Sequence, residues 1–536
     1  MKKYVYIGIT SLFFIARLFL FISIQDVGVE HDGGWYLGMA RNVAERGIYA
    51  SYVNTVATSD KPGSFPSIHG RFSAQDKNGF VYFPAGVTVG PTYIFPESLF
   101  LKLFGYGWVQ YRLWPFIAFC LLIPLLFYVV LQIGSAFALL FFQAWLWFYP
   151  QILLNQSYEA LSEHIALLFL LLGFIFLQKV FLGPKKIFYL GLSGLFLGLS
   201  IQTKNVYALG VIFSVAAVLY SSKNIWKSDR LKHILLFMFF LALPTLLFEL
   251  YRFIILFSQF GLMGYWQNNI DIKRTWESGG SGTIILRTGI NPRFVYNKLA
   301  VWKHLGVDPF VFVLPLILAS PFFKKKNSFL FWNIFFSTII FFTWFGLLSS
   351  TGWFRHIFPA ILMGMILIST TLGSLFDAVV KTKKGVVFLL FCLFLSHVLI
   401  GIFSNNLAIP SFDISKDRII RLFQTPYPNK MQGPLSHPIF SRKSQDEVSY
   451  FIKNKIHSSK KICFYEWALV AELPVLVDRV FFPYPRCGVK DILIVGPYQK
   501  GIYALKHTNL PYIQKNLCKK VLFGNDMYTL CTLGTF

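Results

Sequence analysis

Apolar stretches of about 20 residues recur along almost the whole chain, and they restrict its fold more than any other feature. Each is near the length that a helix needs to cross the hydrocarbon layer of a membrane. Because a backbone in lipid must satisfy its hydrogen bonds internally, such stretches have to be helical. Hydropathy predicts about eleven spans of this kind, near 4–24, 110–132, 135–153, 162–180, 187–203, 206–221, 233–257, 306–323, 328–349, 357–376 and 386–404.

Composition supports the same class of protein. Of the 536 residues, 55% are hydrophobic and 14% are charged, whereas soluble proteins carry roughly 25% charged residues. The chain is therefore predicted to be an α-helical polytopic membrane protein. Its net charge of +26 suits cytoplasmic loops rich in Lys and Arg, anionic membrane lipids and phosphate-bearing ligands. No soluble basic domain of the usual kind is present, so we expect no nucleic-acid partner.

The basic residues also predict the topology. They gather in alternate loops, which the positive-inside rule assigns to the cytoplasm: Lys2-Lys3, Lys185-Lys186, Lys223 to Lys232, Lys324 to Lys326, and Lys381 to Lys384. The N-terminal apolar run is long for a signal peptide and no small-residue cleavage site closes it, so we expect a retained first span. An odd number of spans then places the C-terminal tail outside the cytoplasm.

Three regions follow from this topology. We expect a transmembrane domain at 1–404 with a large first extracytoplasmic loop at 25–109, and a small extracytoplasmic α/β domain at 405–536. In the tail, a predicted amphipathic helix at 444–456 precedes strand-like runs at 461–465 and 491–495. This domain has three candidate roles: closing over an acceptor groove, recognising the acceptor, or stabilising the outer face.

Four of the six cysteines lie in this tail: Cys463, Cys487, Cys518 and Cys531. An even number in an oxidising compartment allows two disulfides. Pairing Cys518 with Cys531 across a predicted hairpin at Gly524-Asn525 would leave Cys463 with Cys487, although the sequence alone leaves the pairing open.

The acidic motif Glu30-His31-Asp32 follows the first span directly and precedes a short amphipathic stretch at 35–46. Acidic groups at the membrane face are scarce in this chain, which makes Asp32 a candidate for chemistry. The alternative is that Asp32 caps a helix beginning near Trp35, and the two roles are compatible. Adjacent residues rarely face one ion, and no zinc-site spacing, P-loop or GxGxxG motif occurs. We therefore expect neither a metal nor a cofactor.

Other candidate residues lie at the predicted outer ends of spans. Glu159 and Glu163 are four residues apart and share a helical face, which also fits simple capping at a solvated interface. Lys204 could snorkel to the interface or bind an anion. Arg355 could hold a phosphate through its planar fork of donors, or be an ordinary interfacial arginine. Auxiliary candidates are Glu30, His31, Arg112 and His164.

Taken together, these motifs resemble the membrane-embedded GT-C glycosyltransferases, in particular the branch of protein O-mannosyltransferases and the lipid A aminoarabinose transferase. The resemblance covers about 1–404 in layout. It is carried by Asp32–Leu37 with Ala40 and Gly47, by Gly105 and Arg112, and by Arg355 with Pro359. The chain departs from the family at three places. His356 stands where Tyr is usual, Lys204 stands where Arg often follows a Leu-Thr pair, and His31 splits the usual acidic pair, which leaves open which carboxylate acts.

The resemblance implies a hexosyl- or pentosyltransferase that uses a polyprenyl-phosphate-linked sugar donor. The acceptor would be a glycan, a lipid or a protein, as in cell-envelope glycan, lipopolysaccharide or protein glycosylation. Asp32 would be the base, with Glu163 or Glu159 as an orienting second acid. Arg355, and second Lys204, would neutralise the leaving lipid phosphate. The expected location is a bacterial inner membrane, with the site facing the periplasm.

Other functions fit parts of the sequence. A lipid flippase without chemistry would use the same basic groups, but it predicts internal repeats and charges at mid-span depth, for which only Glu249 and Arg252 are candidates. An O-antigen ligase or polymerase would place its large loop late in the chain. A catalytically inactive scaffold is a third alternative.

Overall fold

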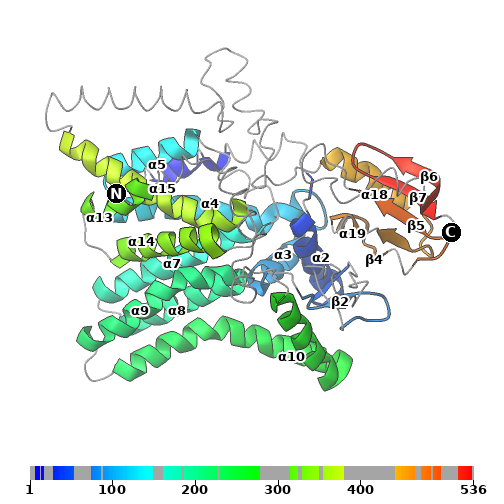
Figure 1. The fold of residues 1–536 in the computed structure, drawn as a ribbon, viewed down its shortest axis with the longest axis horizontal. Helices are drawn as coiled ribbons and strands as arrows, with labels where there is room; N and C mark the ends of the chain where they lie inside the picture. Colours follow the sequence, from blue (N-terminus) through cyan, green and yellow to red (C-terminus); the bar gives the residue numbers. More distant parts are fainter. Residues whose placement is uncertain are drawn as a thin grey trace, which may run out of the picture.

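The computed structural model describes residues 7–12, 14–16, 28–29, 31–52, 74–85, 89–148, 161–182, 186–225, 230–277, 314–323, 329–348, 354–379, 441–464, 472–483, 487–496 and 517–533. Most of these residues belong to a helical bundle, with a small sheet at one end (Figure 1). The bundle contains α4 (Leu113–Ile133), α5 (Ala136–Phe148), α7 (Glu163–Leu182), α8 (Lys186–Thr203), α9 (Ala208–Ile225), α10 (Arg230–Glu277), α13 (Leu314–Phe323), α14 (Phe329–Thr343) and α15 (Phe354–Val379).

Among the described residues, five helical segments are long and apolar enough to cross a membrane: Gln110–Ile133, Glu163–Phe181, Leu231–Lys273, Phe329–Leu348 and His356–Ala378. The chain is thus an integral membrane protein. These segments overlap five predicted spans, whereas the predicted span at 386–404 lies outside the described residues. The count of eleven spans stays a prediction.

Close packing between α8 and α10 depends on small residues. A Cβ at Gly194 would lie 2.6 Å from the backbone oxygen of Phe237, and a Cβ at Gly198 would overlap the carbonyl of Leu241. Small residues let helix backbones approach closely, which favours association in a membrane. Further along, α10 changes direction at Gly261, where φ is +68°, and its second part bends away from the first (Figure 1).

The first loop forms α2 (His31–Arg46), a two-stranded antiparallel ribbon of β1 (Ala50–Ser51) and β2 (Val81–Tyr82), and α3 (Pro91–Phe104). The prediction that a helix begins near Trp35 is wrong, because α2 already begins at His31 and Asp32 lies in its first turn. The helix ends before Gly47, whose φ of +68° is the left-handed conformation that glycine adopts without strain.

The C-terminal unit, which we define as 441–464, 472–483, 487–496 and 517–533, is built on one five-stranded sheet. Its strands are β3 (Ile462–Phe464), β4 (Phe481–Pro483), β5 (Ile492–Val495), β6 (Cys518–Gly524) and β7 (Thr529–Leu533), in the order β4-β3-β5-β7-β6. β3 pairs in parallel with β4 and β5, whereas β7 pairs antiparallel with β5 and β6. The unit also contains α18 (Arg442–Lys455) and α19 (Glu472–Val477).

Both disulfide pairings are confirmed. Cys463 of β3 is bonded to Cys487, and Cys518 of β6 is bonded to Cys531 of β7, with Cα atoms 6.4 Å and 5.4 Å apart respectively. One bond ties β3 to the segment after β4, and the other closes the β6–β7 hairpin.

Helix α2 lies between the bundle and the C-terminal unit (Figure 1). It packs against α3 on one side and α19 on the other, and the residues from Gly33 to Ala40 are buried. The ring of Tyr36 on α2 meets that of Tyr93 on α3 edge to face, with centroids 5.6 Å apart. The helix that carries Asp32 is therefore covered from two directions.

Candidate functional site

Asp32 projects from the first turn of α2 and is half-buried. The backbone just before the acidic motif is fixed by Arg112, whose Nη2 donates to the carbonyl of Gly28 at 2.8 Å. Arg112 is itself buried and also donates to the carbonyl of Trp108 at 3.2 Å. This auxiliary candidate thus supports the chain segment that leads into Asp32.

Glu163 and Lys204, predicted separately as a second acid and a phosphate-binding cation, form one buried ion pair. Their side chains are 1% and 5% exposed. Glu163 also accepts a hydrogen bond from the backbone N–H of Ser162 at 3.1 Å, and its carbonyl accepts one from the hydroxyl of Tyr207 at 2.6 Å. The pair joins the start of α7 to the residue that follows α8.

The loop before α3 is attached to the same place. Val89 forms a β-bridge with Lys204, and the N–H of Gly90 donates to the carbonyl of Thr203 at 3.1 Å. A Cβ at Gly90 would overlap the carbonyl oxygen of Gln202, so this close approach requires glycine. The first loop is thereby held against the Glu163–Lys204 pair.

His164 connects α7 with α4. Its Nε2 lies 2.9 Å from the carbonyl oxygen of Pro115, and its ring lies 5.7 Å from that of Phe119. The side chain is fully buried, and its Nδ1 has no hydrogen-bond partner among the described residues. The arrangement gives this auxiliary candidate a packing role between α7 and α4.

The structure describes less of the other predicted residues. Glu30 and Glu159 lie outside the described residues. His31 and Arg355 are placed by their backbone only, at the first residue of α2 and the second residue of α15. The neighbouring ring of His356 lies 6.0 Å from that of Trp344. The roles assigned to these side chains stay predictions.

Glu97 on α3 is a buried acid that sequence reasoning missed. Its Oε2 accepts a hydrogen bond from the backbone N–H of Trp114 at 3.1 Å, while Oε1 has no hydrogen-bond partner in the described part of the chain. Burial raises the pKa of Glu97 to about 8, against the lowering effect of the Trp114 bond. The available signal was a lone carboxylate in the mostly apolar stretch at 91–104. In the described ranges, no three His, Cys, Asp or Glu residues lie close enough together to hold a metal ion.

Comparison with solved structures shows that the chain has the fold of the GT-C glycosyltransferases. The chain is similar to ArnT from Cupriavidus metallidurans bound to undecaprenyl phosphate, with a TM-score of 0.55 and 13% identity over 98% of this chain and 97% of that chain. It is also similar to the Archaeoglobus fulgidus oligosaccharyltransferase tethered with an acceptor peptide, with a TM-score of 0.52 and 11% identity over 91% of this chain and 69% of that chain.

No protein-family model and no curated protein sequence matches the chain. At such low identities, the likeness to solved structures establishes the fold. The GT-C fold implied by the resemblance of the motifs is therefore confirmed, and it extends over most of the chain.

Proposed function

We propose that this protein transfers a sugar from a polyprenyl-phosphate-linked donor to an acceptor hydroxyl on the extracytoplasmic side of the membrane. The observation that carries the proposal is the shared fold along 98% of the chain with ArnT, a protein solved with undecaprenyl phosphate bound. The position of Asp32, at the start of a helix between the bundle and the C-terminal unit, supports it.

In the proposed reaction, the acceptor oxygen attacks the anomeric carbon and a new C–O bond forms. The bond between that carbon and the phosphate oxygen breaks, and the polyprenyl phosphate leaves with the electron pair. The acceptor proton passes to the carboxylate of Asp32, which acts as a general base. One displacement of this kind inverts the anomeric configuration. The leaving phosphate is a stable anion, so the reaction needs no general acid.

Cations have to neutralise the charge that develops on the leaving phosphate. We assign this role to Arg355, the second residue of α15, and to Lys204. Lys204 is paired with Glu163. To bind a phosphate, its ammonium group therefore has to contact both anions or leave the carboxylate of Glu163. Glu163, with Glu159 as the alternative, is the proposed orienting acid. The pair thus suits a site in which donor binding changes the partner of the lysine.

The proposed topology has eleven spans in a domain at 1–404, with the first loop at 25–109 and a domain at 405–536 both outside the cytoplasm. The disulfides Cys463–Cys487 and Cys518–Cys531 support an oxidising compartment for the C-terminal unit. In a bacterial inner membrane, that compartment is the periplasm. A C-terminal alkaline phosphatase fusion, which is active only outside the cytoplasm, tests this orientation.

The flippase alternative relied on Glu249 and Arg252 as charges at mid-span depth. Arg252 donates to Glu249 at 2.6 Å and 2.9 Å and to the side-chain oxygens of Asn268 and Asn269 at 2.7 Å and 2.6 Å. Asn268 in turn donates to the carbonyl of Phe83 at 3.1 Å. These contacts brace the turn of α10 against the first loop, which favours a structural role for Arg252.

The experiment is sugar transfer in membranes supplied with radiolabelled polyprenyl-phosphate sugars, comparing the wild type with Asp32→Asn. Asp526→Asn, at an exposed carboxylate of the C-terminal unit, is the matched control. We expect Asp32→Asn to abolish transfer while donor binding survives, and the control to keep wild-type activity. Equal transfer by Asp32→Asn and the wild type would remove Asp32 from catalysis. Binding of the donors without transfer to any acceptor class would favour the flippase.

A further inference from the structure

The C-terminal unit is hydrogen-bonded to the backbone directly before the acidic motif. The side-chain amide of Gln445 on α18 accepts a hydrogen bond from the N–H of Val29 at 2.9 Å and donates one to the carbonyl of Val29 at 2.8 Å. The two residues are 416 positions apart in the sequence, and Gln445 and Val29 are 0% and 3% exposed. Both polar groups of one buried backbone unit are therefore satisfied by a single distant side chain.

A buried network fixes the Gln445 amide from the other side. Its nitrogen also donates to the hydroxyl of Tyr528 at 3.4 Å, and that hydroxyl donates to Glu472 at 2.8 Å. All three side chains are fully buried. Because unsatisfied polar groups cost free energy in such a place, the network tolerates little change in geometry. Val29 therefore occupies a defined position relative to the C-terminal unit, two residues before the start of α2.

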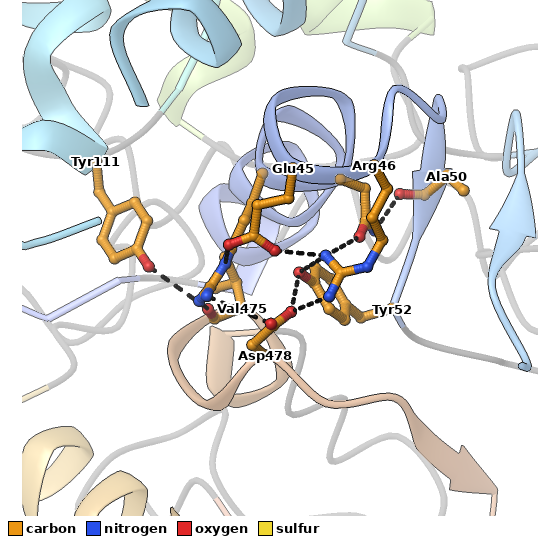
Figure 2. Close-up of polar contacts among 9 residues, drawn as sticks. Glu45, Arg46, Ala50, Tyr52, Tyr111, Val475 and Asp478 are labelled. Atoms are coloured by element: carbon orange, nitrogen blue, oxygen red, sulfur yellow. Dashed lines mark hydrogen bonds and ion pairs between the residues drawn. The ribbon is translucent and has the colours of Figure 1, made fainter. Parts of the chain in front are cut away.

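The same unit holds the other end of α2, as Figure 2 shows. Asp478, which follows α19, accepts hydrogen bonds from Arg46 at 2.8 Å and from the hydroxyl of Tyr52 at 2.6 Å. Arg41 donates to the carbonyl of Val475 and lies 3.6 Å from Asp478. The side chains of Arg46 and Asp478 are about one-third exposed, at 31% and 32%.

Asp478 is charged at neutral pH. Burial raises its pKa, but the hydrogen bond from Tyr52 and the charges of Arg41 and Arg46 outweigh burial and lower the pKa overall. A backbone hydrogen bond from the N–H of Phe481 to the carbonyl of Tyr52 at 3.3 Å continues the contact into β4. This end of α2 is therefore tied to the unit by charge, by side-chain hydrogen bonds and by backbone pairing.

We propose that the C-terminal unit clamps α2 at both ends and thereby positions Asp32, with Gln445 and Asp478 as the positioning residues. The inference deepens the proposed function, because it rests on Asp32 being the base. A helix held at one end can pivot about that end, whereas one held at both ends presents its first turn at a fixed place. Catalysis requires such placement, because a displacement of about 1 Å can cost ~100-fold in rate.

Two variants test the clamp. Gln445→Leu replaces the amide by an apolar side chain of similar size. Asp478→Asn removes the charge, and its backbone φ of +55° is one that Asn tolerates well. Matched controls are Asn454→Leu on the exposed face of α18, and Asp526→Asn. Asp478→Asn changes a partly exposed residue, so it keeps the test open should Gln445→Leu fail to fold.

Hydrogen exchange of the 31–46 segment is measured in the full chain reconstituted in vesicles, together with kcat and KM for the lipid donor. Gln445→Leu removes both hydrogen bonds to Val29, and Asp478→Asn removes the charge that attracts Arg41 and Arg46. We therefore expect α2 to exchange about 10-fold faster in each variant. We expect kcat per folded molecule to fall about 10-fold while KM for the donor stays within about 2-fold, because an interaction made in the transition state is lost. The controls should match the wild type in both measurements.

Unchanged exchange in both clamp variants would overturn the proposal, and so would faster exchange with wild-type kcat. The exchange measurement does not depend on the reaction. If the wild type transfers no sugar, the proposed function fails, and the exchange of α2 still decides whether the C-terminal unit clamps this helix.

Discussion

The buried pair of Glu163 and Lys204 gives a prediction that can be worked out in detail. With side chains 1% and 5% exposed, neither charge is solvated well by water once its partner is gone. Removing one member of such a pair typically lowers the stability of the fold by about 3–5 kcal/mol. Replacing both members by uncharged residues is often neutral or even stabilising. Glu163→Gln and Lys204→Met should therefore each destabilise the protein by about 3–5 kcal/mol, and the double variant by much less than their sum.

The choice of substitutions keeps other contacts in place. Gln at 163 retains an oxygen that can accept the hydrogen bond from the N–H of Ser162, and Met at 204 leaves the backbone bridge to Val89 unchanged. Lys102→Met, at an exposed residue of α3, is the control for loss of a lysine. The coupling energy expected from the cycle is about 3 kcal/mol or more, which is large for two residues in contact.

Thermal unfolding in vesicles of the wild type, the two single variants, the double variant and the control measures this coupling. We expect each single variant to unfold several degrees below the wild type, the double variant to recover most of that loss, and the control to match the wild type. Additive losses would refute the reasoning, because they would mean that the two charges do not depend on each other. Single variants that lose less than about 1 kcal/mol would refute it as well, because surface ion pairs lose that little.

Three further predictions follow from individual contacts. The pKa of Glu97 is raised to about 8, so the fold favours its neutral form; stability should fall as pH rises from about 4.5 to about 8, and thermal unfolding of Glu97→Gln should show a flatter pH profile. Gly90→Ala should reduce the yield of folded protein in membranes severely, because its Cβ would overlap the carbonyl of Gln202; a wild-type yield would contradict this packing. Cys518→Ser with Cys531→Ser, which opens a bond across 13 residues of sequence separation, should lower the stability of the C-terminal unit by about 2–5 kcal/mol, read as faster hydrogen exchange of β6 and β7 with α7 unchanged.

Local features of the fold were predictable from the sequence. The apolar runs at 110–132, 162–180 and 357–376 correspond to α4, α7 and α15, because hydrophobic length is a property of one continuous segment. In the tail, the predicted helix at 444–456 corresponds to α18, and the strand-like runs at 461–465 and 491–495 contain β3 and β5. The disulfide across the β6–β7 hairpin was also predictable, since its turn residues and both cysteines lie close together in sequence.

The arrangement of the candidate site was only partly predictable. Glu163 and Lys204 were found as separate candidates at the ends of spans, but their pairing depends on the packing of α7 against α8, which hydropathy does not encode. The start of α2 was placed too late, because Gly33 and Gly34 argue against a helix and only tertiary burial of this segment compensates for them. The contact of Gln445 with Val29 could not be predicted from the sequence, since the two residues are 416 positions apart.

Two connected sets of long-range polar contacts lie around the candidate site. One set, around Glu163 and Lys204, joins α7 and the end of α8 to the loop before α3. The other, around Gln445 and Asp478, joins the C-terminal unit to both ends of α2. Between the two sets lie α2 and α3, in contact through the rings of Tyr36 and Tyr93. A change in the C-terminal unit is therefore expected to reach Asp32 through α2, and Lys204 through α2 and α3. Both sets join segments that are distant in sequence, so we expect the position of Asp32 to depend on contacts made far from it along the chain.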